Sequence, residues 1–468
     1  MTIQETIGAW ADAHREEYLR DVGRLVAVRS VSGEEKPGMP FGEGPAAALK
    51  EALKLADEQG FRTKDWDGYV MTADLTEGET ALDILAHLDV VGEGDGWDTD
   101  PYTATEKDGC LYGRGTDDDK GPAVAAMYAM RCVRDLAGSG LKKNVRLILG
   151  TDEESGSRDI AYYYAREKSA PYTFSPDASF PVYNTEKGGF VGHFTQEWEK
   201  TDESPRVTAF HGGYRINVLP ADASAFVEGL SAMEVESVCR PLGEVLGVKV
   251  SVTAAPSGAE IAVKGLAAHA STPEQGVNGI TALIYLLCSL PLAENLPSTK
   301  ALHALDRLLP FGDGLGKDLG IAMEDAVSGP LTLAFSLLEM DETHLSGFFD
   351  SRVPICATRE NCRDVAAKNL EAVGFHFEGE MRAPHHTPGD TPFVQSMLRS
   401  YEAYTGRKGE CLSMGGGTYV HDIPGGVAFG TGMPGFETNL HGANERMNIA
   451  DMLTAIKIFA QVIYDLCC

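Results

Sequence analysis

Between residues 45 and 185, amphipathic segments alternate with short apolar runs, and polar residues follow the apolar runs. Residues 45–59 and 121–137 have the pattern of helices, and the second is rich in Ala and Met with Pro122 near its first turn. Residues 81–88 and 145–150 have the pattern of strands. This alternation is typical of an α/β sheet, which usually carries its functional side chains at the carboxyl ends of its strands.

The pattern changes near residue 188 and changes back near residue 383. Between these points, alternating strands such as residues 260–264 are combined with longer helices. After residue 383 the α/β pattern resumes, with a predicted helix at 393–405, a strand at 427–430 and a helix at 449–466. A chain of 468 residues is also longer than one core usually organises. We therefore expect a discontinuous domain of residues 1–187 and 383–468, with residues 188–382 forming an inserted domain.

Composition excludes several classes of protein. The formal net charge of -29 is scattered along the chain, so the protein should repel nucleic acid and anionic membrane surfaces. The first 30 residues carry charges on an amphipathic helical pattern, and residues 281–291 fit a buried helix better than the roughly 18 apolar residues of a membrane span. The nine cysteines form no close C-x-x-C pair and fit reduced thiols. We expect a soluble cytoplasmic protein with no nucleic-acid or membrane partner.

The first candidate site residues are His87 and Asp89, in the segment Leu-Asp-Ile-Leu-Ala-His-Leu-Asp-Val-Val of residues 82–91. Two residues apart at a strand end, both side chains point to the same face. The imidazole can then bind a metal while the carboxylate orients it. The alternative is an ordinary hydrogen-bonded histidine at the end of a strand.

The second candidate is the run Asp117, Asp118 and Asp119, which lies between glycines where a helix is predicted to begin. An acidic helix cap is the simpler interpretation. Three adjacent aspartates repel one another and exceed what a cap requires, so a bound divalent cation explains the run better.

A third acidic cluster follows the predicted strand 145–150 and contains Glu153 and Glu154. On an extended chain these neighbours point in different directions, which suits one metal ligand and one proton carrier. A solvated acidic loop is the alternative. Asp177 follows another strand and His441 lies in a late loop, and each is a weak signal alone.

Taken in order, these segments resemble the di-zinc exopeptidases, a family that includes aminoacylase, carboxypeptidase G, succinyl-diaminopimelate desuccinylase and carnosinase-like dipeptidases. The resemblance covers nearly the whole chain and rests on H-x-D, G-R-G-x-x-D-x-K-G, E-E-x-G-S, P-D and a late histidine. It is greatest to the PepV-type dipeptidases, through S-P-D-A-S-F-P-V ending at Val182, E-K-G at 186–188 and G-G-G-T-Y at 415–419.

The resemblance implies a zinc-exopeptidase fold, an α/β catalytic domain with a mixed sheet and an inserted α+β lid domain. It implies two zinc ions, with Mn or Co as possible substitutes. Asp118 matches the bridging ligand because it precedes the residue before Lys120, and Asp119 is the reserve candidate. The other roles implied are terminal ligation by His87, Asp177, Glu154 and His441, general-base catalysis by Glu153, and orientation of a ligand by Asp89.

In the inserted segment, residues 265–273 match the part of the family's lid whose histidine reaches the active site. This makes His269 an expected oxyanion stabiliser, although without the resemblance it would be interpreted as a structural histidine. Asn217 and Arg352 match lid positions that hold the substrate carboxylate, together with backbone amides near Gly417. The long insertion resembles an enlarged lid that replaces a partner subunit, so a monomer is expected. Val420 and His421 depart from the family pattern, which often has a small residue followed by arginine.

The activity implied is zinc-dependent hydrolysis of unblocked dipeptides by a zinc-bridging hydroxide, with a small peptide as the substrate. An N-acyl amino-acid deacylase or desuccinylase is the alternative enzyme, because the same zinc core serves these reactions. A catalytically silent peptide-binding protein would require a missing ligand or base, and all the expected residues are present.

Overall fold

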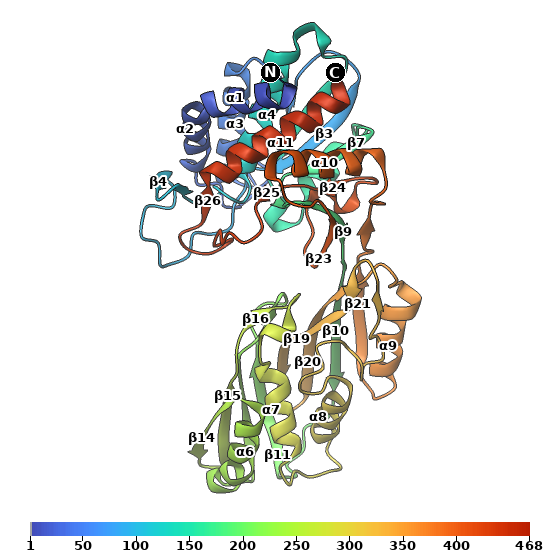
Figure 1. Cartoon of the computed structure of the whole chain (residues 1–468). Helices are drawn as coiled ribbons and strands as arrows, with labels where there is room; N and C mark the ends of the chain where they lie inside the picture. Colours follow the sequence, from blue (N-terminus) through green and yellow to red (C-terminus); the bar gives the residue numbers. More distant parts are fainter. Residues whose placement is uncertain (1) are drawn as a thin grey trace. The chain divides into compact units, whose positions relative to one another are not determined.

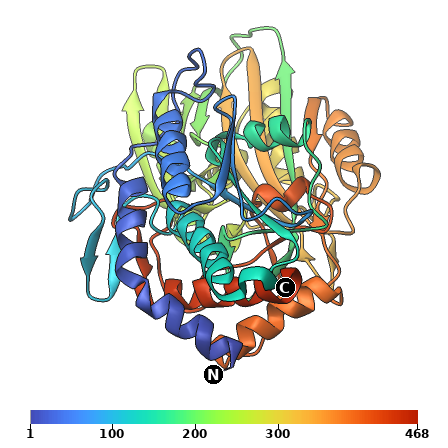
Figure 2. The ribbon, with the colours of Figure 1, turned by 90° about the horizontal axis from the view of Figure 1, so that it is seen from above.

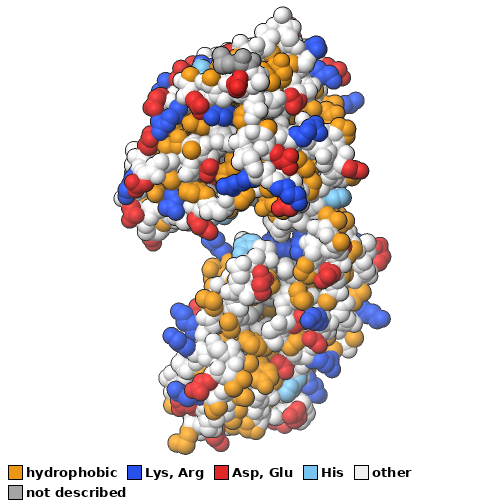
Figure 3. Space-filling model, viewed as in Figure 1, with side chains coloured by type: hydrophobic (Ala, Val, Ile, Leu, Met, Phe, Trp, Pro, Cys, Tyr) orange, Lys and Arg blue, Asp and Glu red, His pale blue; other side chains and the backbone are white. Residues whose placement is uncertain are grey.

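The computed structural model describes residues 2–468, and the chain divides into two compact units. Unit 1 comprises the described residues up to Thr185 together with His386–Cys468, and unit 2 comprises Glu186–His385. Figure 1 shows the elements of each unit, and on the face seen in Figure 3 acidic and basic side chains are interspersed on both units. No helix within residues 2–468 has an apolar stretch long enough to span a membrane.

Unit 1 is built on a mixed nine-stranded sheet of order β1-β2-β6-β3-β7-β24-β9-β22, with β23 paired to β9. Its strands are β1 Arg62–Trp66, β2 Val70–Asp74, β3 Thr80–His87, β6 Asn144–Gly150, β7 Tyr172–Ser175, β9 Val182–Glu186, β22 His385–His386, β23 Cys411–Met414 and β24 Val427–Ala428. The central strands β6, β3, β7 and β24 run parallel, whereas β1, β2 and β9 pair antiparallel with their neighbours. The predicted α/β class with a mixed sheet is confirmed.

Seven α-helices belong to unit 1: α1 Ile3–Ala13, α2 Arg15–Val26, α3 Glu43–Glu58, α4 Lys120–Ala137, α5 Arg158–Tyr164, α10 Pro392–Thr405 and α11 Ile449–Cys467. The C-terminal helix α11 contacts α1, α4 and α10 (Figures 1 and 2). Helix α4 is buried along most of its length, which its Ala- and Met-rich composition permits, and it ends at Gly138 with φ 49. The amphipathic N-terminal region forms two helices, α1 and α2, separated at His14.

The predicted C-terminal end of one strand in this unit is wrong. The strand expected at 427–430 stops at Ala428. Gly430 follows with φ 83, a left-handed conformation that turns the chain out of the strand.

Unit 2 is an α+β unit with an antiparallel eight-stranded sheet of order β14-β15-β13-β11-β19-β20-β10-β21. Its strands are β10 Gly188–Glu197, β11 Arg206–Gly212, β13 Asp222–Glu228, β14 Lys249–Ala255, β15 Gly258–Lys264, β19 Thr332–Met340, β20 His344–Val353 and β21 His376–Met381. The helices α6 Ala232–Leu246, α7 Gly279–Cys288, α8 Pro297–Leu308 and α9 Asp364–Glu371 pack on it around one apolar core. Helix α7 is the buried helix expected near residues 281–291.

Candidate metal centre

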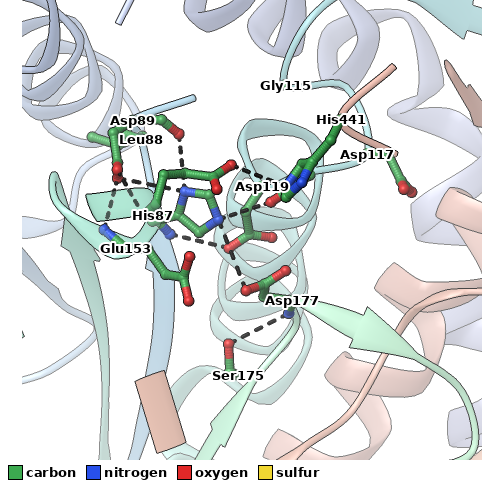
Figure 4. Close-up of polar contacts among 12 residues, drawn as sticks. His87, Leu88, Asp89, Gly115, Asp117, Asp119, Glu153, Ser175, Asp177 and His441 are labelled. Atoms are coloured by element: carbon green, nitrogen blue, oxygen red, sulfur yellow. Dashed lines mark hydrogen bonds and ion pairs between the residues drawn. The ribbon is translucent and has the colours of Figure 1, made fainter. Parts of the chain in front are cut away.

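The predicted ligands of unit 1 converge at the carboxyl ends of β3, β6 and β7 (Figure 4). His87 is the last residue of β3, and Asp118 lies two residues before α4. Glu153 and Glu154 begin the short 3-10 helix η2 (Glu153–Ser155), which follows β6, and Asp177 follows β7. His441 comes from the loop before β26 (Arg446–Asn448) and has φ 58, a strained conformation for a histidine.

Asp118 presents each of its carboxylate oxygens to a different histidine. Its Oδ1 lies 2.9 Å from Nε2 of His87, and its Oδ2 lies 2.8 Å from Nε2 of His441. Burial alone would raise the pKa of Asp118, but the hydrogen bonds to the two imidazoles outweigh burial and lower it. Asp118 and Glu154 in turn raise the pKa of the half-exposed His441 to about 10.

Two further carboxylates flank this arrangement. Nε2 of His87 lies 3.8 Å from Oδ2 of Asp177, and Nε2 of His441 lies 3.3 Å from Oε1 of Glu154. Ligand atoms of His87, Asp118 and Glu154 lie within 4.8 Å of one another, and so do those of His87, Glu153 and Asp177. Imidazole nitrogens and carboxylate oxygens are the donors that zinc takes in catalytic sites, so this donor set fits divalent metal ions.

Asp119, the reserve candidate for the bridging ligand, has a different environment. Its Oδ2 accepts a hydrogen bond from the backbone N–H of His87 at 3.0 Å. Its Oδ1 has no hydrogen-bond partner among residues 2–468, and burial raises its pKa well above the usual value. Asp117 points away from the other side chains in Figure 4, and burial raises its pKa to about 8.

Asp89 contacts His87 mainly through its backbone. Nδ1 of His87 lies 2.9 Å from the carbonyl oxygen of Asp89 and 3.5 Å from its Oδ1. Since a carbonyl can only accept, Nδ1 carries a proton. In the metal-free protein Nε2 also carries one and donates it to Asp118, because the hydrogen bonds to Asp118 and Asp89 outweigh burial and raise the pKa of His87 well above its usual value. A metal ion would take the place of the proton on Nε2. The Asp89 carboxylate accepts the backbone N–H groups of Glu153 at 3.2 Å and Glu154 at 3.0 Å. It therefore holds the acidic turn as well as lying beside the imidazole.

Glu153 and Glu154 are not on an extended chain, so the conformation expected for them from the sequence was wrong. Their two N–H groups turn toward Asp89 and start the 3-10 helix instead of continuing β6. The side chains still serve different neighbours, because Glu154 groups with Asp118 and Glu153 with Asp177. Burial, with the nearby charge of Asp177, raises the pKa of Glu153 well above its usual value.

The buried side chains of Tyr419 and Asp159 support the turn that leads from β6 to Glu153. The Tyr419 hydroxyl donates a 2.6 Å hydrogen bond to Oδ2 of Asp159, and the same oxygen accepts the N–H groups of Thr151 and Asp152 at 2.5 and 2.9 Å. The Tyr419 ring also contacts His87 edge to face, with centroids 6.2 Å apart. No role was predicted for Asp159 from the sequence, although it lies only a few residues after the acidic cluster.

Buried charges at two other positions were also missed. Arg114, within the G-R-G motif, is 1% exposed, and Glu445, four residues after His441, is 0% exposed. Arg114 lies within the G-R-G motif, and Glu445 lies beside the His441-Gly442 pair. A charged residue so close to predicted metal ligands was the only sequence signal for these two roles.

The remaining predicted residues are distributed over both units. His269 lies on β16 (Ala268–His269), which pairs with β12 (Val218–Leu219), and the carbonyl of Asn217 accepts the N–H of Ala270 at 3.0 Å. Asn217 and His269 thus belong to one small two-stranded element of unit 2. Arg352 lies on β20 and forms a 2.9 Å ion pair with Asp350. Gly417 lies in unit 1, before the 3-10 helix Tyr419–Asp422.

Histidines and carboxylates at the carboxyl edge of an α/β sheet, in a chain interrupted by an α+β unit, are the arrangement expected of a metal-dependent hydrolase. Residues 84–465 match the model of peptidase family M20/M25/M40, and the chain belongs to this family. It is therefore a hydrolase that acts on peptide bonds.

The similarity to relatives covers nearly the whole chain. The protein is 35% identical to YtjP of Bacillus subtilis (strain 168), over 97% of each chain. It is 32% identical to the Beta-Ala-Xaa dipeptidase of Lactobacillus delbrueckii subsp. lactis, again over 97% of each. Among solved structures, human carnosine dipeptidase 1 has a TM-score of 0.62 and 18% identity, covering 100% of this chain and 99% of the other. That structure shows the shared fold.

Proposed function

We propose that the protein is a zinc-dependent dipeptidase of broad specificity that hydrolyses unblocked dipeptides. The observation that carries this proposal is the carboxylate of Asp118, whose two oxygens each face an imidazole, one from His87 and one from His441. A bridging ligand requires such an arrangement. The similarity to the Beta-Ala-Xaa dipeptidase, over 97% of both chains, supports a dipeptide as the substrate.

In this proposal, His87 and Asp177 would hold one metal ion, His441 and Glu154 would hold the other, and Asp118 would be a ligand of both. Zn is the expected metal, with Mn or Co as substitutes. When bound, such ions would acidify a water molecule and polarise the carbonyl of the scissile bond.

Glu153 is the proposed general base. It lies beside Asp177 and His87, and burial raises its pKa, which makes its carboxylate a stronger proton acceptor than a free one. Glu153 would accept the proton of the attacking water and return it to the departing amine. Asp89 would support this step by fixing the backbone N–H of Glu153 and the imidazole of His87.

The substrate-binding roles are assigned to Asn217, His269, Arg352 and Gly417. Arg352 offers the planar fork that binds a carboxylate in two places, Asn217 and backbone amides near Gly417 add neutral donors, and His269 would stabilise the oxyanion. These assignments predict that Asn217→Ala raises the KM for dipeptides. An unchanged KM would remove Asn217 from the binding site and leave the metal assignment in place. We further propose that the protein acts as a monomer in the cytoplasm.

The deciding experiment measures hydrolysis of free dipeptides, carnosine, and N-acetylated and N-succinylated amino acids by metal-stripped protein, with and without added Zn or Mn. Metal-dependent cleavage of free dipeptides is the expected result. Cleavage confined to acylated substrates would instead identify a deacylase or desuccinylase. Metal binding without any cleavage would identify a silent peptide-binding protein.

A further inference from the structure

Glu445 connects the loop that carries His441 to the turn that carries Asp118. One oxygen of its buried carboxylate, Oε1, accepts three backbone N–H groups, from Gly115 at 3.0 Å, Asp117 at 2.9 Å and Asp118 at 3.2 Å. The carboxylate and the Asp118 amide are 327 residues apart in sequence. A single side chain therefore fixes the backbone of the predicted bridging ligand from the far end of the chain.

Arg114 completes the connection from the other side. Its Nη1 donates to Oε2 of Glu445 at 2.6 Å, and its Nη2 donates to the carbonyls of Gly92 at 3.3 Å and Gly442 at 3.1 Å. Gly442 directly follows His441, so the guanidinium holds the backbone of the histidine loop. In addition, the N–H of Gly113 donates to the backbone carbonyl of Glu445 at 3.0 Å.

Burial of the Glu445–Arg114 ion pair is an energetically unfavourable means of joining two loops. Removing a carboxylate and a guanidinium from water costs several kcal/mol per ion, and an apolar pair of similar volume is often as stable or more so. A charged pair does have one property that an apolar pair lacks, because its hydrogen bonds fix direction and distance. Here one of these bonds ends on the backbone of Asp118 and another on Gly442, the residue after His441. The side chains of Asp118 and His441 themselves meet at 2.8 Å.

We propose that Glu445 and Arg114 are positioning residues that hold His441 against Asp118 and so set the affinity of one metal position. The inference rests on the proposed two-metal site. The affected position is the one assigned to Asp118, Glu154 and His441. The other position shares Asp118 but also uses His87 and Asp177, which lie at the ends of β3 and β7 and which neither Glu445 nor Arg114 holds, so it should be affected less.

The test is zinc binding to the full chain, measured by competition with a chromophoric chelator for wild type, Glu445→Gln and Glu445→Gln with Arg114→Gln. We expect wild type to bind two equivalents. Both variants should bind one equivalent about 10- to 100-fold more weakly, the usual cost of losing a group that orients a ligand, and the other nearly as wild type. Their kcat for dipeptides should fall with little change in KM.

The double variant separates positioning from an unpaired buried charge, because it leaves neither charge in place. Its folding stability should recover relative to Glu445→Gln, whereas its weak zinc position should not. Asp74→Asn is the matched control, since it breaks the half-buried 2.8 Å Asp74–Arg146 ion pair of the same unit, away from the metal ligands. It should bind both zinc ions as wild type does.

Two results have different meanings. If wild type binds two zinc ions and the variants either bind both normally or lose both equally, the positioning role alone is overturned. Wild-type protein that binds fewer than two would overturn the proposed two-metal function and this inference with it.

Discussion

Replacing Gly150 by alanine should destabilise unit 1 and slow catalysis, because no space exists for a Cβ atom at the end of β6. An ideal Cβ would lie 2.1 Å from the hydroxyl oxygen of Tyr419 and 2.3 Å from Oδ2 of Asp159. Both side chains are buried and bonded to each other at 2.6 Å, and the same Asp159 oxygen accepts the N–H groups of Thr151 and Asp152. Neither atom can move aside without breaking one of these bonds.

The magnitude follows from these contacts. A buried polar group left without its partner costs about 1–3 kcal/mol, and an overpacked core costs about 1–3 kcal/mol more. The expected loss is therefore about 2–6 kcal/mol, a large share of the roughly 5–15 kcal/mol typical of a folded domain. Because Thr151 and Asp152 lead into Glu153, the displaced turn should also lower kcat.

The assay is urea unfolding of metal-free protein, followed by circular dichroism, together with steady-state kinetics of the metal-loaded enzyme. Gly8→Ala is the control, since Gly8 lies in α1 of the same unit and a Cβ added there would have nothing within 4 Å, so the variant should gain about 0.5–1 kcal/mol. Adding Tyr419→Phe to Gly150→Ala removes the nearest atom and should show a coupling of about 0.5–3 kcal/mol. A Gly150→Ala protein as stable as wild type would refute the steric argument.

Three other predictions concern the site and its sheet. Glu153→Gln should lower kcat by about 10²- to 10⁴-fold while zinc titration still finds two equivalents, and near-normal turnover would show that another group is the base. Asp118→Asn should lose both zinc ions on dialysis and Asp119→Asn should retain them; the reverse result would make Asp119 the bridging ligand. Burial raises the pKa of Asp83 from 3.8 to about 6, so the folded protein retains a proton that the unfolded chain has released in this range. Stability should thus fall by up to about 3 kcal/mol as pH rises from about 4 to about 6, and an Asp83→Asn curve with the same slope would contradict this.

The elements that the sequence predicted well are those whose pattern repeats over many residues. Strand β3 was expected at 81–88 and observed at Thr80–His87, and α4 was expected at 121–137 and observed at Lys120–Ala137. Burial on both faces of the central sheet produces continuous apolar runs, and these can be recognised without a structure. The conformation of Glu153 and Glu154 could not be predicted from the sequence. It depends on hydrogen bonds from their N–H groups to Asp89, which lies more than 60 residues earlier in the chain.

The run Asp117, Asp118 and Asp119 shows what the sequence could not distinguish. Mutual repulsion led us to expect a shared cation, but each aspartate has its own environment. Burial raises the pKa of Asp117 to about 8, so this carboxyl is largely protonated at neutral pH in the metal-free protein. Burial also raises the pKa of Asp119 well above its usual value, which favours its neutral form. Asp118 alone has a lowered pKa, because His87 and His441 lie against its two oxygens. The fold thus favours the charged form of Asp118, which a bridging ligand requires, and eases the repulsion by favouring the neutral forms of Asp117 and Asp119.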